Sequence, residues 1–226
     1  MMVHLRCMRN NLNGSFFLLF FTCFQATSCG QGMNLESPII FYGGSFNPPH
    51  LGHDQIIQNV LNESPDSQVW VVPSAAPAAA KGQVPKRDLA PFVDRLEMCR
   101  RAFAHFGDKV YVSDLEKDPD TTHYTWDSLE QLPREAKGLV VGGDQYESFD
   151  RWHRANDLLE KTSLYVQPRD GSSQIERSGV TFLNGDFHSA SSTKIRAALL
   201  HEELLILKAW LNPEVLSWIQ QNDLYM

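Results

Sequence analysis

Short runs of apolar residues alternate along this chain with longer segments in which apolar positions recur every three or four residues. The runs cover 39–42, 69–72, 110–112, 139–141, 164–166 and 180–183. Such runs predict buried strands, whereas the longer spacing predicts helices with one apolar face. Strands that alternate with helices usually form a parallel sheet covered on both sides. We therefore predict one α/β domain with a parallel sheet and helices on both faces.

The helical spacing is clearest after residue 91, where Phe92, Leu96, Cys99, Phe103 and Phe106 recur at steps of four and three. Further helices are predicted from about His53, and over 125–132, 155–161, 193–200 and 213–219. The last begins at Asn212-Pro213, which combines a capping residue with a proline in the first turn. Residues 73–91 are rich in Ala and Pro and predict a long loop.

The first 32 residues differ from the rest. They carry Arg6 and Arg9 and no acid, and then run through the apolar stretch 16–24 to a cysteine, Cys29. This order is similar to a lipoprotein signal. The alternative is upstream sequence without a role, because Met33 is a plausible start. We exclude 1–32 from the fold as a non-domain N-terminal extension and assign 33–226 to the domain.

Composition and charge narrow the classes of function. The 226 residues have a formal net charge of −7, and no stretch of 18 apolar residues occurs. We therefore expect no nucleic-acid partner and no membrane span in the domain. Beyond residue 32 the chain has one cysteine, Cys99, so the domain has no internal disulfide and is expected in the cytoplasm.

The polar, glycine-rich strings lie where the predicted strands end. In parallel α/β sheets ligands bind at the carboxyl ends of the strands. One site is therefore predicted to collect the strings GGSFNPPHLGH, VPSAAP, DLEK, GGDQ and QPRDG.

The string GGSFNPPHLGH, residues 43–53, has the features of an anion site. Gly43 and Gly44 allow the backbone to approach a phosphate and to place N–H groups on it. The two prolines stiffen the loop, and His50 and His53 are three apart at a helix start, so both rings can face one side. Gly52 would leave room for a nucleotide. Two alternatives are a zinc site, for which no third ligand lies at helical spacing, and ordinary surface histidines.

The whole pattern resembles the HxGH nucleotidyltransferase superfamily. GGSFNPPHLGH is similar to its first motif, and SSTKIR, residues 191–196, to its second. GLVVGGDQYESFDRWHR, VSDLEKDPDTTHYTWDSLEQL and LNPEVLSWIQQNDLY resemble strings of bacterial nicotinate-nucleotide adenylyltransferases. The resemblance spans 38–225. It implies a Rossmann-like nucleotidyltransferase fold that transfers AMP from ATP to nicotinate mononucleotide, giving deamido-NAD and pyrophosphate in NAD biosynthesis.

The resemblance also implies roles for individual residues. His50, His53 and Arg196 would be catalytic. The ATP-binding set would be Gly43, Gly44, Ser45, Phe46, His50, His53, Gly142, Asp144, Ser192, Thr193 and Arg196. The set for nicotinate mononucleotide would be Tyr124, Thr125, Trp152 and Lys81. Mg²⁺ would arrive on the ATP phosphates without protein ligands. Departures from the family pattern are AAAK where PPHK is usual, which leaves Lys81 as the only match, and His123 in place of serine.

Several alternatives stay open at this point. Other adenylyltransferases of the superfamily, acting on nicotinamide mononucleotide or phosphopantetheine, share the two motifs. An aminoacyl-tRNA synthetase of class I has similar motifs but needs a tRNA-binding domain. An exported lipoprotein that only binds a ligand would fit the N-terminal segment. The sequence leaves the oligomeric state open, including a homo-oligomer.

Overall fold

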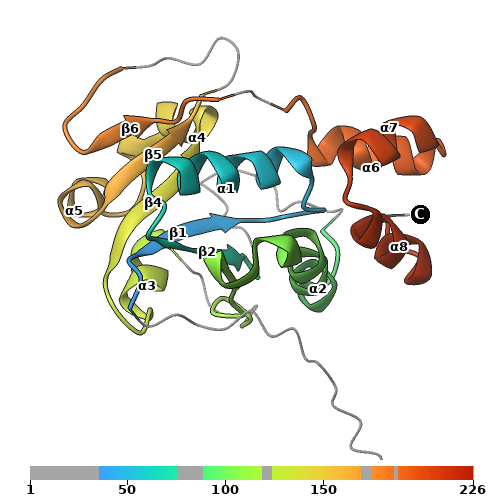
Figure 1. Cartoon of the computed structure of the whole chain (residues 1–226), viewed down its shortest axis with the longest axis horizontal. Helices are drawn as coiled ribbons and strands as arrows, with labels where there is room; N and C mark the ends of the chain where they lie inside the picture. The colour runs from blue at the N-terminus through green and yellow to red at the C-terminus, as the bar shows by residue number, and fades with distance from the viewer. Residues whose placement is uncertain (1–35, 76–88, 119–123, 169–174, 186–187, 226) are drawn as a thin grey trace, which may run out of the picture. The chain divides into compact units, whose positions relative to one another are not determined.

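The computed structural model of the chain describes residues 36–75, 89–118, 124–168, 175–185 and 188–225 (Figure 1). In these ranges the strands form one sheet in the order β3-β2-β1-β4-β5-β6. Every neighbouring pair is parallel. The predicted parallel sheet is confirmed. The strands are β1 (Ile39–Gly44), β2 (Gln68–Pro73), β3 (Val110–Val112), β4 (Ala136–Gly142), β5 (Ser163–Gln167) and β6 (Val180–Phe182).

Helices connect the strands and continue after the last one. They are α1 (Leu51–Glu63), α2 (Phe92–Phe103), η1 (Ala104–Lys109), α3 (Thr125–Glu130), α4 (Gly143–Glu147), η2 (Phe149–Arg151), α5 (Ala155–Lys161), α6 (Ser192–Leu200), α7 (Leu204–Trp210) and α8 (Pro213–Gln221). Figure 1 shows α6, α7 and α8 gathered at one end of the sheet, beyond the carboxyl end of β1.

Alternate residues of the strands feed two separate hydrophobic clusters. In β1, Ile40 and Tyr42 join the cluster that contains α1, α2, α6 and α8, whereas Ile39 and Phe41 join the one that contains α3, α4 and α5. A strand buried on both faces is an unbroken apolar run, which explains the runs 39–42, 69–72 and 139–141, whereas β6 is half-buried. Helices on both faces are thereby confirmed.

Some element boundaries differ from the sequence-based expectation. The helix predicted from about His53 begins at Leu51, and β4 begins at Ala136. The helix after residue 91 ends as an α-helix at Phe103 and continues as the 3₁₀ segment η1. Phe106 still packs against the core from that segment.

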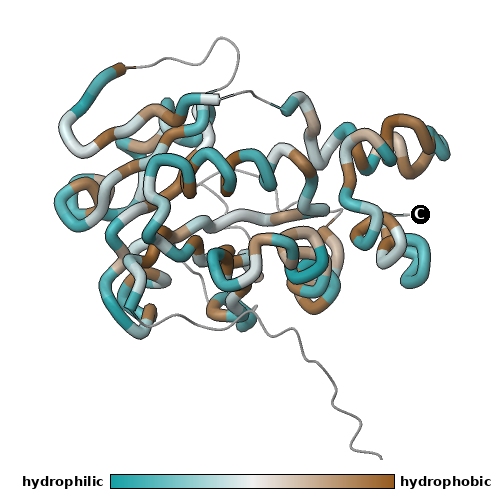
Figure 2. The backbone as a smooth tube through the Cα atoms, in the orientation of Figure 1, coloured by the Kyte–Doolittle hydropathy of each residue, from teal (hydrophilic) through white to brown (hydrophobic). Residues whose placement is uncertain are grey.

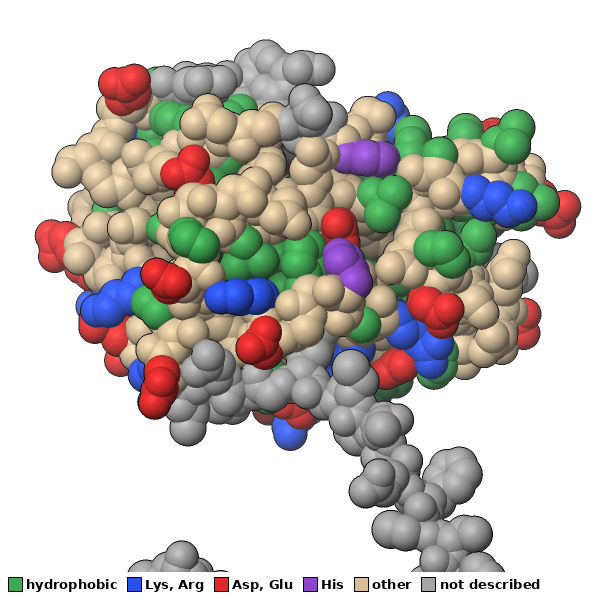
Figure 3. Space-filling model, viewed as in Figure 1, with side chains coloured by type: hydrophobic (Ala, Val, Ile, Leu, Met, Phe, Trp, Pro, Cys, Tyr) green, Lys and Arg blue, Asp and Glu red, His purple; other side chains and the backbone are tan. Residues whose placement is uncertain are grey.

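Two helices were not predicted. The helix α4 has only five residues, too few for a periodic pattern. The helix α7 has the sequence LLILKAW, which is apolar on nearly all sides and gives no amphipathic signal (Figure 2). Figure 3 shows hydrophobic side chains gathered over α6 and α7, and Leu200, Leu204 and Leu205 are exposed there.

The strand order reverses direction at β1. Connections from β1 lead to β2 and β3 on one side, and the chain then crosses to β4 on the other. In open α/β sheets, ligands bind in the crevice at this switch point, outside the carboxyl ends of the strands. The loop after β1 and the start of α4 after β4 both lie at this edge. The N-terminal extension 1–32 and the loop residues 76–88 fall outside the described ranges. No helix within those ranges has the length and apolarity needed to cross a bilayer.

Candidate active site

The loop between β1 and α1 is held by hydrogen bonds to its main chain. The carbonyl of Gly44 accepts from the backbone N–H of Ser74, which follows β2. A Cβ on Gly43 would lie 2.8 Å from Phe41 Cε1, so the ring of Phe41 also requires glycine there. Phe46 is buried, and its ring packs edge-on against Tyr42 at 5.3 Å. Any contact of Phe46 with a nucleotide is therefore left to its main chain.

His50 and His53 form a stacked pair at the start of α1. Their ring centroids are 3.8 Å apart, with 33° between the planes. The backbone N–H of Gly52 donates to His50 Nδ1 at 3.1 Å, and the backbone N–H of His50 donates to His53 Nδ1 at 3.1 Å. The two imidazoles thus cap the helix reciprocally, as Ser and Glu do in a capping box.

This capping fixes the tautomer of both rings. A ring nitrogen that accepts a hydrogen bond carries no proton, so each neutral imidazole has its proton on Nε2. In that tautomer the N–H donor of His50 and of His53 is at Nε2. Two such donors side by side at a helix N-terminus favour an anion. The expectation that both rings face one side is confirmed by their stacking.

The Cβ position of Gly52 faces protein atoms. A Cβ there would lie 3.0 Å from Cε1 and Nδ1 of His50 and 3.4 Å from the carbonyl oxygen of His188. The expectation that Gly52 leaves room for a nucleotide stays a prediction. Glycine is needed because His50 folds back over the first turn of its own helix.

Arg95 joins three loops at this edge of the sheet. Its side chain is fully buried, and its guanidinium donates to the carbonyls of Ser45 at 2.8 Å, Ala75 at 3.2 Å and Ala90 at 2.9 Å. These carbonyls belong to the segments after β1, after β2 and before α2. Burial lowers the pKa of Arg95, but an arginine remains protonated at physiological pH.

The second motif docks on the first. Ser192 Oγ donates to the carbonyl of Pro48 at 2.9 Å, and Arg196 Nη1 donates to the carbonyl of Asn47 at 2.8 Å. Both side chains come from α6, whose N-terminal turn is thereby brought against the loop that carries His50. The structure thus brings Ser192 and Arg196 to the histidine loop, as a shared anion site requires.

A cavity of about 540 Å³ adjoins Arg196. Thr193 is exposed and lies on its wall. The other lining residues come from the segment before α2, from the same face of α6 and from the residues after α8: Leu89, Ala90, Pro91, Ala197, Leu200, Asp223, Leu224 and Tyr225. The histidines do not line this cavity, which is bordered by Arg196 and Thr193 of α6.

Gly142 and Asp144 lie beside the β1 loop at the end of β4. Gly142 caps the short helix α4, and its N–H donates to Gln145 Oε1 at 3.0 Å. Asp144 is exposed in the first turn, and a Cβ on Gly142 would lie 2.9 Å from its Oδ1. The carboxylate therefore lies against the backbone of the glycine.

The residues expected to bind the pyridine nucleotide come from two segments that touch. Tyr124 precedes α3, and its ring stacks on His153 at a centroid distance of 4.6 Å. Thr125 is the first residue of α3. Trp152 is half-buried and its ring lies 5.2 Å from that of Phe149, so this indole has a packing role as well.

Further contacts join the same two segments. The guanidinium of Arg154 lies 3.7 Å from the ring centroid of Trp126 in α3. The buried Ser128 donates from Oγ to Glu116 Oε1 at 2.5 Å. The helix α3 is thus held by Glu116 through Ser128 and by Arg154 through Trp126.

Lys81 and His123 lie outside the described residues. Within the described ranges, no three or more His, Cys, Asp or Glu side chains are grouped to hold a metal ion.

Three residues of the site were missed: Asn47, Arg95 and Tyr225. Asn47 was in view inside GGSFNPPHLGH, but an asparagine in a loop has no periodic signal. Arg95 does have one, because it lies three residues after Phe92 and four before Cys99, on the apolar face of α2. A charged residue on a buried face indicates a dedicated set of partners.

Comparison with known proteins gives a family model and named relatives that match this chain. A family model described as cytidylyltransferase-like matches residues 41–198. A protein of Pseudothermotoga lettingae named probable nicotinate-nucleotide adenylyltransferase is 28% identical over 196 residues, covering 81% of this chain and 95% of that protein. A protein of the same name from Thermotoga sp. (strain RQ2) is 31% identical over 176 residues, covering 73% of this chain and 86% of that protein.

Solved structures share the fold. The nicotinic acid mononucleotide adenylyltransferase of Plasmodium falciparum complexed with NaAD superposes with a TM-score of 0.68 at 21% identity, covering 84% of this chain and 97% of that one. The same enzyme complexed with APC superposes with a TM-score of 0.65 at 20% identity. The family match covers both motifs, from the end of β1 to Arg196 in α6, so this chain belongs to the cytidylyltransferase-like family of nucleotidyltransferases.

Proposed function

We propose that this chain transfers the AMP part of ATP to nicotinate mononucleotide, forming deamido-NAD and pyrophosphate. The observation that carries the proposal is the docking of Ser192 and Arg196 on the main chain of the loop that bears His50 and His53. This contact brings the side chains of Ser192 and Arg196 to the loop that carries the two imidazoles. All four groups can donate hydrogen bonds to phosphate oxygens, and they lie at the switch point of the sheet. The names of the relatives in the Thermotoga group support the choice of substrate.

In the proposed reaction the histidines stabilise charge and form no covalent bond. An oxygen of the mononucleotide phosphate attacks the α-phosphorus of ATP in line. The bond from that phosphorus to the bridging oxygen breaks, and pyrophosphate leaves with the electron pair. The Nε2–H groups of His50 and His53 would donate to the α-phosphate oxygens as their charge rises. Donors placed in advance for such charge supply the largest part of many rate enhancements.

The remaining ATP contacts follow the loop and α6. Backbone N–H groups of Gly43, Gly44, Ser45 and Phe46 would line the phosphates, and Ser192, Thr193 and Arg196 would receive the β and γ groups. Thr193 and Arg196 line the cavity of about 540 Å³, which suits the leaving pyrophosphate. Gly142 and Asp144 would bind the ribose. The carboxylate of Asp144 can accept hydrogen bonds from two ribose hydroxyls. The substrate would be MgATP, with Mg²⁺ held by phosphate and water oxygens.

The pyridine nucleotide would bind between α3 and the segment after η2. Trp152 would stack on the pyridine ring, and the N–H groups at Tyr124 and Thr125 would meet its carboxylate. Lys81 would bind the phosphate of the mononucleotide. The stacking of Tyr124 on His153 supports this arrangement, because it shows that the two segments form one surface.

The bond that breaks provides a direct test. The full chain is incubated with Mg²⁺, nicotinate mononucleotide and ATP labelled at either the α- or the γ-phosphate. The α label should enter the dinucleotide and the γ label should leave as pyrophosphate. Entry of the γ label into the acceptor would identify a phosphotransferase and overturn the proposal, as would the absence of any transfer.

A further inference from the structure

Tyr225, which follows α8, is hydrogen-bonded to the histidine loop. Its hydroxyl donates to Asn47 Oδ1 at 2.7 Å, across 178 positions of the sequence. The backbone N–H of Ala90 donates to the same oxygen at 3.0 Å. Asn47 is only 1% exposed, so this amide oxygen meets protein donors rather than bulk water.

Asn47 links these two donors to the candidate site. Its main-chain carbonyl accepts from Arg196, and the next carbonyl, of Pro48, accepts from Ser192. Two residues further along is His50, which caps α1. A shift of Asn47 would therefore move two things together: the backbone that leads to His50, and the carbonyl that accepts from Arg196.

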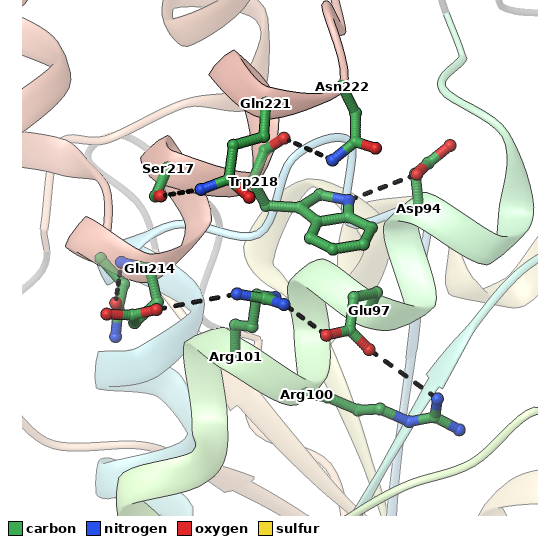
Figure 4. A network of polar contacts seen from close by, with 10 residues as sticks. Asp94, Glu97, Arg100, Arg101, Glu214, Ser217, Trp218, Gln221 and Asn222 are labelled. Carbon is green, nitrogen blue, oxygen red and sulfur yellow. Dashed lines mark hydrogen bonds and ion pairs between the residues drawn. The ribbon is translucent and has the colours of Figure 1, made fainter.

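The segment that delivers Tyr225 is itself anchored (Figure 4). Trp218 Nε1 donates to Asp94 Oδ1 in α2 at 3.3 Å, and the guanidinium of Arg101 lies 4.4 Å from the Trp218 ring centroid. Arg101 also pairs with Glu97 at 2.8 Å and with Glu214 at 3.7 Å. Because α8 is fixed on α2 by this network, the hydroxyl of Tyr225 has a defined place from which to hold Asn47.

We infer that Tyr225 is a positioning residue of the active site, acting through Asn47 on the loop 45–50. The catalytic consequence rests on the proposed function, whereas the effect on the loop does not. Positioning of Asn47 needs the hydroxyl of Tyr225, because the hydroxyl makes the hydrogen bond. Packing of the ring against the core, beside Leu224, does not need it. Burial raises the pKa of Tyr225, which keeps the hydroxyl a donor at physiological pH.

The catalytic test compares Tyr225→Phe with Tyr165→Phe in the full chain. The control variant also loses a tyrosine hydroxyl. The hydroxyl of Tyr165 pairs with Ser64 Oγ at 2.7 Å, at the C-terminal end of α1 and away from the histidines. We expect Tyr225→Phe to lower kcat for AMP transfer about tenfold with KM for ATP within about twofold, since a small misplacement of reacting groups is costly. The control should keep kcat within about twofold. An equal kcat for both variants and the wild type would overturn the inference.

A double-mutant cycle with Asn47→Ala separates positioning from general loss of structure. If Tyr225 acts through Asn47, Asn47→Ala and Asn47→Ala/Tyr225→Phe should have the same kcat within about twofold. Independent, multiplicative losses would contradict the route through Asn47.

Hydrogen exchange tests the loop without any assay of function. In Tyr225→Phe the backbone amides of residues 45–53 should exchange at least about threefold faster than in Tyr165→Phe, while those of β1 stay unchanged. Equal exchange in the two variants would overturn the inference even if the chain transferred no AMP. A wild-type chain with no AMP transfer but with the expected exchange difference would overturn only the proposed function.

Discussion

Arg196 Nη1 donates to the carbonyl oxygen of Asn47 at 2.8 Å, although the two residues are 149 positions apart in the sequence. The contact joins α6 to the loop between β1 and α1. It uses an N–H group at one edge of the guanidinium, and Arg196 also lines the cavity beside Thr193. The two motifs that were recognised separately in the sequence therefore act as one structural unit.

Replacement of His53 tests the histidine pair. His53→Ala removes one of the two Nε2–H donors and should lower kcat about 10²-fold or more. The folded state should lose only about 1 kcal/mol, because one hydrogen bond from His50 N–H is lost. Steady-state kinetics and thermal unfolding check both effects. His201→Ala, at an exposed histidine after α6, is the control and should retain full turnover. A His53→Ala enzyme with normal kcat would remove His53 from the mechanism.

Arg196→Lys tests the geometry of the guanidinium rather than its charge. Lysine keeps the charge but cannot hold the Asn47 carbonyl and offer a planar pair of donors at the same time. We expect kcat/KM for ATP to fall about 10- to 100-fold, with KM for nicotinate mononucleotide changed less than about threefold. Lys194→Ala, at an exposed position of the same helix, should leave both values unchanged. Full activity of Arg196→Lys would show that charge alone is sufficient.

Trp152→Ala tests the proposed stacking on the pyridine ring. The indole packs on Phe149, so the melting temperature should fall whatever its role. The distinguishing result is a rise in KM for nicotinate mononucleotide of about tenfold without a matching rise for ATP, since stacking on aromatic rings contributes roughly 0.5–1.5 kcal/mol. Trp210→Ala, in the other hydrophobic cluster, should lower stability without this selectivity. Equal loss of both substrates would identify Trp152 as structural.

Arg95→Met should destabilise the fold. The substitution leaves the carbonyls of Ser45, Ala75 and Ala90 without their common donor, and buried unsatisfied groups cost about 1–3 kcal/mol each. We expect the free energy of unfolding in urea to fall by about 3 kcal/mol. Arg100→Met, at an exposed position on the same helix, should change it by about 0.5 kcal/mol or less. Similar values for the two variants would exclude the bridging role of Arg95.

Alkaline pH should destabilise the chain through Cys99. Burial raises the pKa of this thiol above its ordinary value of about 8.5. Between the two pKa values the unfolded chain has lost the proton and the folded chain has kept it, so a rise in pH favours unfolding. The thiol alone should lower the free energy of unfolding by about 1.4 kcal/mol per pH unit above about pH 9. Denaturant titrations from pH 8 to 10 should give a shallower slope for Cys99→Ala. An unchanged slope would contradict the burial of Cys99.

The sheet could be predicted because its strands are buried on both faces. That burial makes each strand an apolar run, as in Ile39–Tyr42, and the alternation with helices then determines a parallel order. The motif residues His50, His53, Ser192 and Arg196 could be predicted to share one site because the strings that contain them resemble two motifs of one superfamily. The long-range hydrogen bonds of Ser192 to Pro48 and of Arg196 to Asn47 could not be predicted, because they use main-chain carbonyls.

Two other features lack a sequence signal for physical reasons. The capping of α1 by His50 uses a residue type that rarely caps helices, so the contact of its imidazole with Gly52 has no sequence signal. The contact between Tyr225 and Asn47 depends on the path of α8 over α2, which is set by side chains such as Trp218 and Arg101. Arg95, by contrast, does have a sequence signal. It is a cation at helical spacing from apolar residues that are expected to be buried.

The most direct test of the central claim is substrate choice by the full chain. Pyrophosphate release is measured with MgATP and, in parallel, nicotinate mononucleotide, nicotinamide mononucleotide or phosphopantetheine. We predict a kcat/KM for nicotinate mononucleotide at least about 100-fold above the others, because backbone N–H groups at Tyr124 and Thr125 would bind a carboxylate more strongly than an amide. A preference for nicotinamide mononucleotide or phosphopantetheine would contradict the assignment of the pyridine site while leaving the phosphate chemistry intact.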